Sequence, residues 1–150
     1  MTLPSDIKIR FLSSLVLLSV LIFSLIRGET YFTVFLIIVS LFMFFEWMRL
    51  ISKNYWIIRG FIASTGLAII LMIGSINSLS IITFFLSFLF LTIFSKLTIE
   101  NYKMSSFGFI YISLSILTIN WIRESDQGLL LLIIILSTIF VSDIAAYIFG

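Results

Sequence analysis

The chain contains no cysteine and no histidine among its 150 residues. These two absences exclude disulfide bonds, thiolate chemistry, haem ligation through histidine, and any zinc site or general base that depends on histidine. Charged residues are scarce as well, at 11%, and there is a single proline. Any chemistry must therefore use carboxylates, lysines, hydroxyl groups or a hard cation such as Mg²⁺.

Apolar residues dominate what remains: 61% of the chain is hydrophobic, and 17 residues are phenylalanine. This composition lies far outside that of soluble domains and is typical of an integral membrane protein. Long isoleucine and leucine runs favour helices, which satisfy their own backbone hydrogen bonds, whereas strands of a membrane barrel would alternate apolar and polar residues. The predicted fold class is all-α, as a single transmembrane region without a soluble domain or linker.

Polar residues divide the chain into six apolar segments, most of them long enough to span a bilayer. Their predicted ranges are 11–26, 31–48, 58–75, 79–95, 104–121 and 128–149. The first is the shortest, so its helix must lie nearly upright or be extended by the flanking bases Lys8 and Arg10. No Ala-x-Ala-like cleavage site follows it, so it is predicted to be a retained helix rather than a signal peptide.

The positions of the basic residues predict the orientation of these six spans. Seven of the nine lysines and arginines precede the first segment or flank the second and fourth loops, and only Arg27 and Arg123 lie at the other loops. This positive-inside bias places both termini in the cytoplasm. The net charge of +2 therefore reflects topology and does not indicate nucleic-acid binding.

Asp143 is the most unusual residue, because it interrupts the apolar segment 128–149. A carboxylate near the centre of a membrane helix costs about 2.5–3.5 kcal/mol on insertion scales, so it indicates a site or a buried polar contact. Helical spacing predicts one face shared by Asp143, Ala146, Tyr147 and Gly150. We expect this face to point into protein in the cytoplasmic half of the bilayer, with Asp143 as a candidate Mg²⁺ ligand. A structural acid paired with a lysine, serine or tyrosine of another helix is the alternative.

Glu46 is a second acid at the membrane boundary, near the cytoplasmic end of segment 31–48. The simpler interpretation is a local ion pair with Arg49, three residues on, beside an interfacial Trp47. The alternative places Glu46 in a substrate or cation environment with Asp143, since both acids are predicted on the same side of the bilayer.

Two segments carry small and hydroxyl-bearing residues at helical spacing, which is typical of helix packing in membranes. The first set is Gly60, Ser64 and Ala68, and the second is Gly108, Tyr111, Ser115 and Thr118. We predict packing faces here rather than a substrate lining. In the fourth loop, Lys96, Glu100 and Lys103 suit either phosphate attraction or an ordinary solvated, positive-inside loop.

The segment Asp143-Ile-Ala-Ala-Tyr-Ile-Phe-Gly150 fits the pattern Asp-x-x-Ala-Tyr-x-x-Gly after an apolar helix. In this it resembles the mid-chain motif of bacterial phosphatidate cytidylyltransferases (CDP-diacylglycerol synthases). The dipeptide Glu46-Trp47 supports the resemblance, which spans the whole chain and corresponds to the N-terminal half of that family. Weaker agreements, in chain order, are Arg10, Ser13, Gly108, Tyr111, Arg123 and Gly128.

The resemblance implies a multi-pass enzyme of the bacterial cytoplasmic membrane. Such an enzyme condenses CTP with phosphatidic acid and releases CDP-diacylglycerol and pyrophosphate, with Mg²⁺ as cofactor. It implies a substrate or cation environment that includes Asp143, Tyr147 and Glu46, with Asp143 as the metal ligand.

The family continues beyond this motif with a C-terminal signature rich in lysine, aspartate, histidine and glycine, which this sequence lacks. We therefore expect the chain to represent the first half of such an enzyme and to be inactive alone. Its partner would be a missing C-terminal half or a homo-oligomer. A truncated gene product, a split-gene subunit completed by another chain and a fragment of a longer protein all agree with the sequence. Two alternatives from other classes are a noncatalytic membrane assembly protein and a small transporter component, because either can carry an intramembrane acid.

Overall fold

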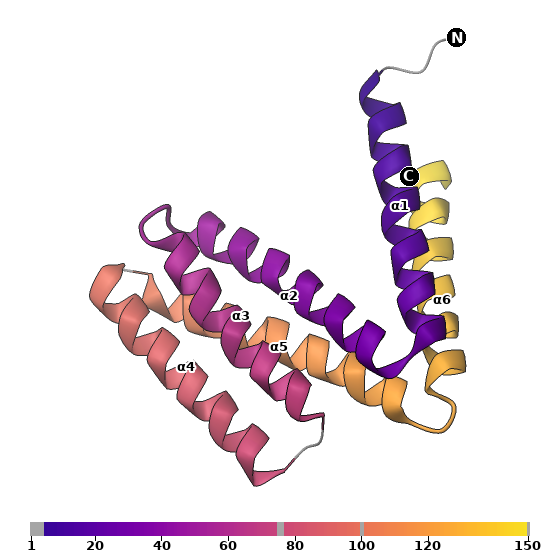
Figure 1. Ribbon diagram of the computed structural model, residues 1–150. Coiled ribbons are helices and arrows are strands. Elements are labelled where there is room, and N and C mark those ends of the chain that lie inside the picture. The colour runs from indigo at the N-terminus through magenta and orange to yellow at the C-terminus, as the bar shows by residue number, and fades with distance from the viewer. Residues whose placement is uncertain (1–4, 75–76, 100, 150) are drawn as a thin grey trace.

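The computed structural model describes the backbone of residues 5–74, 77–99 and 101–149, and side chains from 16 to 146 except at 29, 75, 76 and 100. This part of the chain forms six helices and no strand (Figure 1). They are α1 (Ser5–Arg27), α2 (Glu29–Ile51), α3 (Trp56–Ile73), α4 (Ser78–Thr98), α5 (Tyr102–Glu124) and α6 (Gly128–Phe149). The prediction of an all-α fold with one helix for each apolar segment is confirmed.

Helices α1, α2, α4 and α5 extend past the predicted apolar segments into the polar residues that flank them, whereas α3 ends at Ile73 and α6 has the predicted bounds. The clearest case is α1, which begins at Ser5 and has 23 residues, or about 34 Å of helix. The shortness predicted for the first segment therefore applies only to its apolar part. Among the residues described with their side chains, five helices, α2 to α6, are long and apolar enough to cross a membrane, and the part of α1 that was included adds the apolar stretch Val16–Arg27. The chain is a multi-pass membrane protein.

Helices α2 to α5 form a four-helix bundle in which α2 contacts α3 and α5, and α4 contacts the same two helices. Figure 1 shows α1 and α6 leaving this bundle together at one end, where α1 joins α2 and α5 joins α6. The two outer helices run side by side and are lined by apolar residues where they face each other. The bundle is thus the packed body of the molecule, and α6 departs from it.

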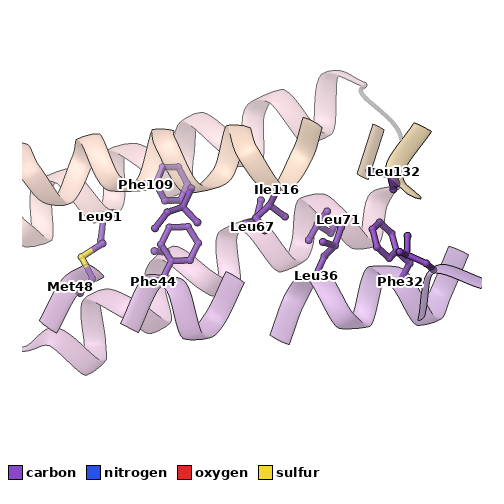
Figure 2. Close-up of a cluster of buried hydrophobic side chains, with 13 residues drawn as sticks. Phe32, Leu36, Phe44, Met48, Leu67, Leu71, Leu91, Phe109, Ile116 and Leu132 are labelled. Atoms are coloured by element: carbon purple, nitrogen blue, oxygen red, sulfur yellow. The ribbon is translucent and has the colours of Figure 1, made fainter. Parts of the chain in front are cut away.

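The core of the bundle is made of aromatic and aliphatic side chains from all four helices (Figure 2). The rings of Phe44 in α2 and Phe109 in α5 stack with centroids 5.8 Å apart, and Leu67 and Leu91 are fully buried. In lipid, helices associate by van der Waals packing rather than by the hydrophobic effect. Close shape matching at these contacts is therefore what holds the bundle together.

Small residues allow the bundle helices to approach closely, as predicted. Gly60 lies against the ring of Phe45, and a Cβ built at Gly60 would overlap that ring. Ser64, one turn further along α3, is buried, and Ala68 is half-buried. The predicted packing face of this helix is confirmed.

The packing face of α5 differs from the predicted one. Gly108 is buried as expected, but Tyr111 and Thr118 are exposed. The buried face continues from Gly108 to Ile112 and Ile116, at spacings of four residues rather than three. The prediction was wrong for Tyr111 and Thr118, because both spacings are helical and hydroxyl content alone does not tell which stripe meets a neighbour.

Arg59, in the first turn of α3, is completely buried. Its Nη1 donates to Ser105 Oγ at 3.0 Å, and its Nη2 donates to the carbonyl oxygens of Met48, Ser52 and Asn54 at 3.3, 2.7 and 2.9 Å. The side chain thereby ties the end of α2 and the α2–α3 loop to α5. In the sequence, Arg59 was counted among the seven loop bases that predict the orientation of the helices. Its guanidinium, however, lies inside the protein.

Arg123 connects the end of α5 to the corner between α1 and α2. Its Nη2 donates to the carbonyl oxygen of Leu25 at 2.9 Å. Gly28 forms the corner with φ of 76°, a left-handed value that favours glycine, and a Cβ built there would lie 3.0 Å from Arg123 Nη2. The departure of α1 from the bundle is therefore set by a glycine and an arginine.

Replacing Arg123 by alanine is expected to loosen this corner without unfolding the bundle. Loss of one charge-assisted hydrogen bond should accelerate amide hydrogen exchange in residues 28–33 by about tenfold. Arg27→Ala is the matched control, because the Arg27 guanidinium lies over the exposed Phe23 ring at 5.6 Å. Equal acceleration in both variants would contradict a specific role for Arg123.

Candidate functional site

Asp143 lies in the C-terminal half of α6 with its side chain exposed. Ala146, on the same helical face, is exposed too, so the described part of this chain does not cover the face that was expected to point into protein. The side chains of Tyr147 and Gly150 lie outside the described residues. The physical reason is that α6 leaves the bundle early: its buried residues, Gly128 and Leu132, belong to its first turns. Within the described part of the chain, no neighbouring helix then covers the acid.

Glu46 is exposed near the end of α2. The guanidinium of Arg49 lies over the ring of Trp56 at 6.0 Å, and no ion pair with Glu46 occurs within the described part of the chain. The predicted local pair is wrong, because the Trp56 ring at the start of α3 offers Arg49 a cation–π contact. Figure 1 shows the C-terminal ends of α2 and α6 diverging, so the structure does not bring Glu46 beside Asp143.

Trp47, expected as an interfacial residue, joins two helices. Its Nε1 donates to the carbonyl oxygen of Met104 at 3.1 Å. Its ring fills the space over Gly108, where a Cβ would overlap it. The Glu46-Trp47 dipeptide therefore contributes a packing residue and an exposed acid, and the sequence signal for this contact was the small residue at position 108.

The donor set around Asp143 suits a cation only in part. Among the described residues, no group of three or more aspartates and glutamates converges on one point. Mg²⁺, however, commonly binds through one or two carboxylates and fills its other positions with substrate phosphates and water. A single exposed carboxylate is compatible with that mode, in which the phosphates of a substrate provide most of the ligands.

Comparison with known proteins gives one match that covers nearly the whole chain. Residues 8–150 match the cytidylyltransferase family, a span that includes Glu46-Trp47 and the Asp143-x-x-Ala-Tyr motif. The searches of curated proteins and of solved structures found no match. The multi-pass helical fold and the motif on α6 agree with the family resemblance in the sequence. The chain belongs to the cytidylyltransferase family.

Proposed function

We propose that this chain serves a phosphatidate cytidylyltransferase, which converts CTP and phosphatidic acid into CDP-diacylglycerol and pyrophosphate in phospholipid biosynthesis. The observation that carries the proposal is the family match over residues 8–150, within which Asp143 stands in the Asp-x-x-Ala-Tyr motif. The basic residues of the loops support an active face on the cytoplasmic side of a bacterial cytoplasmic membrane, where CTP is present.

The proposed reaction is a nucleotidyl transfer between two anions. A phosphate oxygen of phosphatidic acid forms a bond to the α-phosphorus of CTP, and the bond from that phosphorus to the β-phosphate oxygen breaks to release pyrophosphate. Bound Mg²⁺ would offset the phosphate charge that opposes this approach. Asp143 would hold the cation on the predicted cytoplasmic half of α6. Tyr147, one turn on, would donate a phenolic hydrogen bond to a phosphate.

The face of α6 that carries Asp143 is exposed, so the proposed cation site needs further groups around it. An exposed carboxylate facing hydrocarbon is unfavourable by about 2.5–3.5 kcal/mol on insertion scales. We therefore propose that a protein surface outside the described residues covers the Asp143 face in the active enzyme. Such a surface would also supply catalytic groups that the described residues do not bring to Asp143.

The test is a chromosomal Asp143→Asn substitution in the native host. Membranes from this strain are assayed for transfer of radiolabelled cytidylyl groups to phosphatidic acid. We expect a loss of roughly 10- to 100-fold relative to wild type, as is typical when a group that positions a metal is altered. Asp126→Asn is the matched control, since Asp126 is an exposed acid in the α5–α6 loop, and it should retain wild-type activity.

The same strains separate the alternative functions. Unchanged cytidylyl transfer in Asp143→Asn membranes, with deletion of the gene also harmless to that activity, would contradict the proposal. A change only in abundance or association would favour a noncatalytic assembly protein, and a lost ion or solute flux would favour a transporter component. Assay of membranes that contain the 150-residue chain as the sole source of the activity tests the expectation that it is inactive alone.

A further inference from the structure

An apolar groove of about 360 Å³ lies between α1 and α6, where the two helices run side by side outside the bundle (Figure 1). We call it the outer groove. Leu18, Leu21 and Leu25 line it from α1. Its volume falls in the usual range for small-molecule sites. Packed protein leaves few spaces of this size, so the two helices leave room between them for another molecule.

The lining of the outer groove suits a hydrocarbon chain. Ser137 is the one polar side chain among its described lining residues, and its Oγ already donates to the carbonyl oxygen of Ile133 at 2.7 Å. The groove extends from Leu129 to Phe140, or about 16 Å along α6. A volume of about 360 Å³ over that length admits one extended chain, but it does not admit a helix, which is about 10 Å wide.

The outer groove and Asp143 share one face of α6. The lining residues Leu129, Ile133, Leu136 and Phe140 follow one another at alternating spacings of four and three residues, which places them in one stripe of a helix. Asp143 comes three residues after Phe140 and continues that stripe. The groove therefore leads along α6 to the carboxylate proposed to hold the cation.

The depth of the outer groove matches one leaflet of a bilayer. Asp143 and Ile133 are ten residues apart on α6, which corresponds to about 15 Å of helix. The acyl chains of one leaflet fill about half of a hydrocarbon layer near 30 Å thick, or about 15 Å as well. A lipid with its phosphate beside Asp143 could thus lay one chain along the groove, with the chain end near Ile133.

We propose that the outer groove holds one acyl chain of the lipid whose phosphate reacts at Asp143. This inference rests on the proposed function, which identifies that lipid as phosphatidic acid. The protein surface proposed to cover Asp143 would lie at the level of the headgroup, whereas the groove lies deeper in the hydrocarbon layer.

The test is photo-crosslinking in native membranes that contain the whole protein. The probe is phosphatidic acid with a diazirine near the end of one acyl chain, and the crosslinked residues are identified by mass spectrometry. We expect adducts within residues 129–140 of α6 and 18–26 of α1, the segments that line the groove. Excess unlabelled phosphatidic acid should remove them, whereas an equal excess of phosphatidylcholine should not.

Two variants fill the outer groove from opposite walls. Ser137→Phe and Leu21→Trp are each expected to lower the adduct yield by about tenfold, because a bulky side chain would overlap the lipid chain. Thr138→Phe is the matched control for the first. Ser137 and Thr138 are both exposed and both donate to the carbonyl oxygen four residues earlier, but Thr138 is outside the lining. Its adduct yield should equal that of wild type.

Each contrary result has a defined meaning. Adducts outside the groove, or equal losses in Ser137→Phe and Thr138→Phe, would overturn the groove as the place of binding. Phosphatidylcholine that competes as well as phosphatidic acid would overturn the substrate assignment, because the groove would then hold bulk lipid. Cytidylyl transfer is assayed in the same membranes. Transfer without groove adducts contradicts this inference alone, and competed groove adducts without transfer support it while contradicting the proposed function.

Discussion

Replacement of Arg59 by methionine is expected to lower the free energy of unfolding by about 3–5 kcal/mol. Methionine preserves much of the side-chain volume but removes every donor. The carbonyl oxygens of Met48, Ser52 and Asn54 and the hydroxyl of Ser105 then lose a hydrogen bond that Arg59 supplies. Unfolding in mixed detergent micelles, followed by circular dichroism, measures the loss.

Arg49→Met is the control for this experiment. Arg49 is exposed near the same end of α2 and makes a cation–π contact with Trp56, which at an exposed site contributes about 0.5–1 kcal/mol. Arg59→Lys should recover only part of the stability, because an ammonium lacks the planar fork that reaches several acceptors at once. A stability loss as small for Arg59→Met as for Arg49→Met would contradict the structural role of the buried guanidinium.

Substitution of Gly108 by alanine is expected to destabilise the α2–α5 interface by about 2–3 kcal/mol, as overpacking in tightly packed interiors does. The added Cβ would overlap the indole ring of Trp47, and moving that ring would also break its hydrogen bond to Met104. Helix propensity alone predicts the opposite effect, because alanine is a better helix former than glycine by about 1 kcal/mol. A loss of stability would therefore indicate the overlap with Trp47. SDS-induced unfolding monitored by tryptophan fluorescence measures the change.

Two further variants test whether Trp47 is the cause. Ile110→Ala changes an exposed side chain of α5 and should alter stability by less than about 0.5 kcal/mol. Trp47→Leu combined with Gly108→Ala should cost less than the sum of the two single changes, because the overlap exists only when both side chains are present. Additive effects would show that the two residues do not interact.

The pattern of apolar segments predicted the helices well, yet the details of their packing followed from the bundle. Gly60 and Gly108 were recognisable as contact positions, because small residues at helical spacing are frequent where membrane helices meet. Their partners, Phe45 and Trp47, were not recognisable. Which large side chain occupies the space over a glycine depends on the rotation and offset of two helices, and neither is encoded within one segment.

The sequence predicted which residues form the candidate motif, but it did not predict how their side chains are placed relative to the other helices. Asp143 stood out because a carboxylate in an apolar helix is unfavourable, and the motif around it agrees with the family match. Its exposure could not be predicted, because helical spacing tells which residues share a face and not what that face meets. Arg59 shows the opposite case: it resembled a loop base in the sequence, yet it is fully buried.

The amino-acid sequence by itself determined that this protein is a bundle of membrane helices of the cytidylyltransferase family. Each helix satisfies its backbone hydrogen bonds within one continuous segment, so hydrophobicity and length suffice to predict it. Only the tertiary structure decided that α6 leaves the bundle, that Arg59 is enclosed, and that α1 and α6 form an apolar groove between them. These features depend on shape matching and hydrogen bonds between segments far apart in the chain, which no single segment specifies.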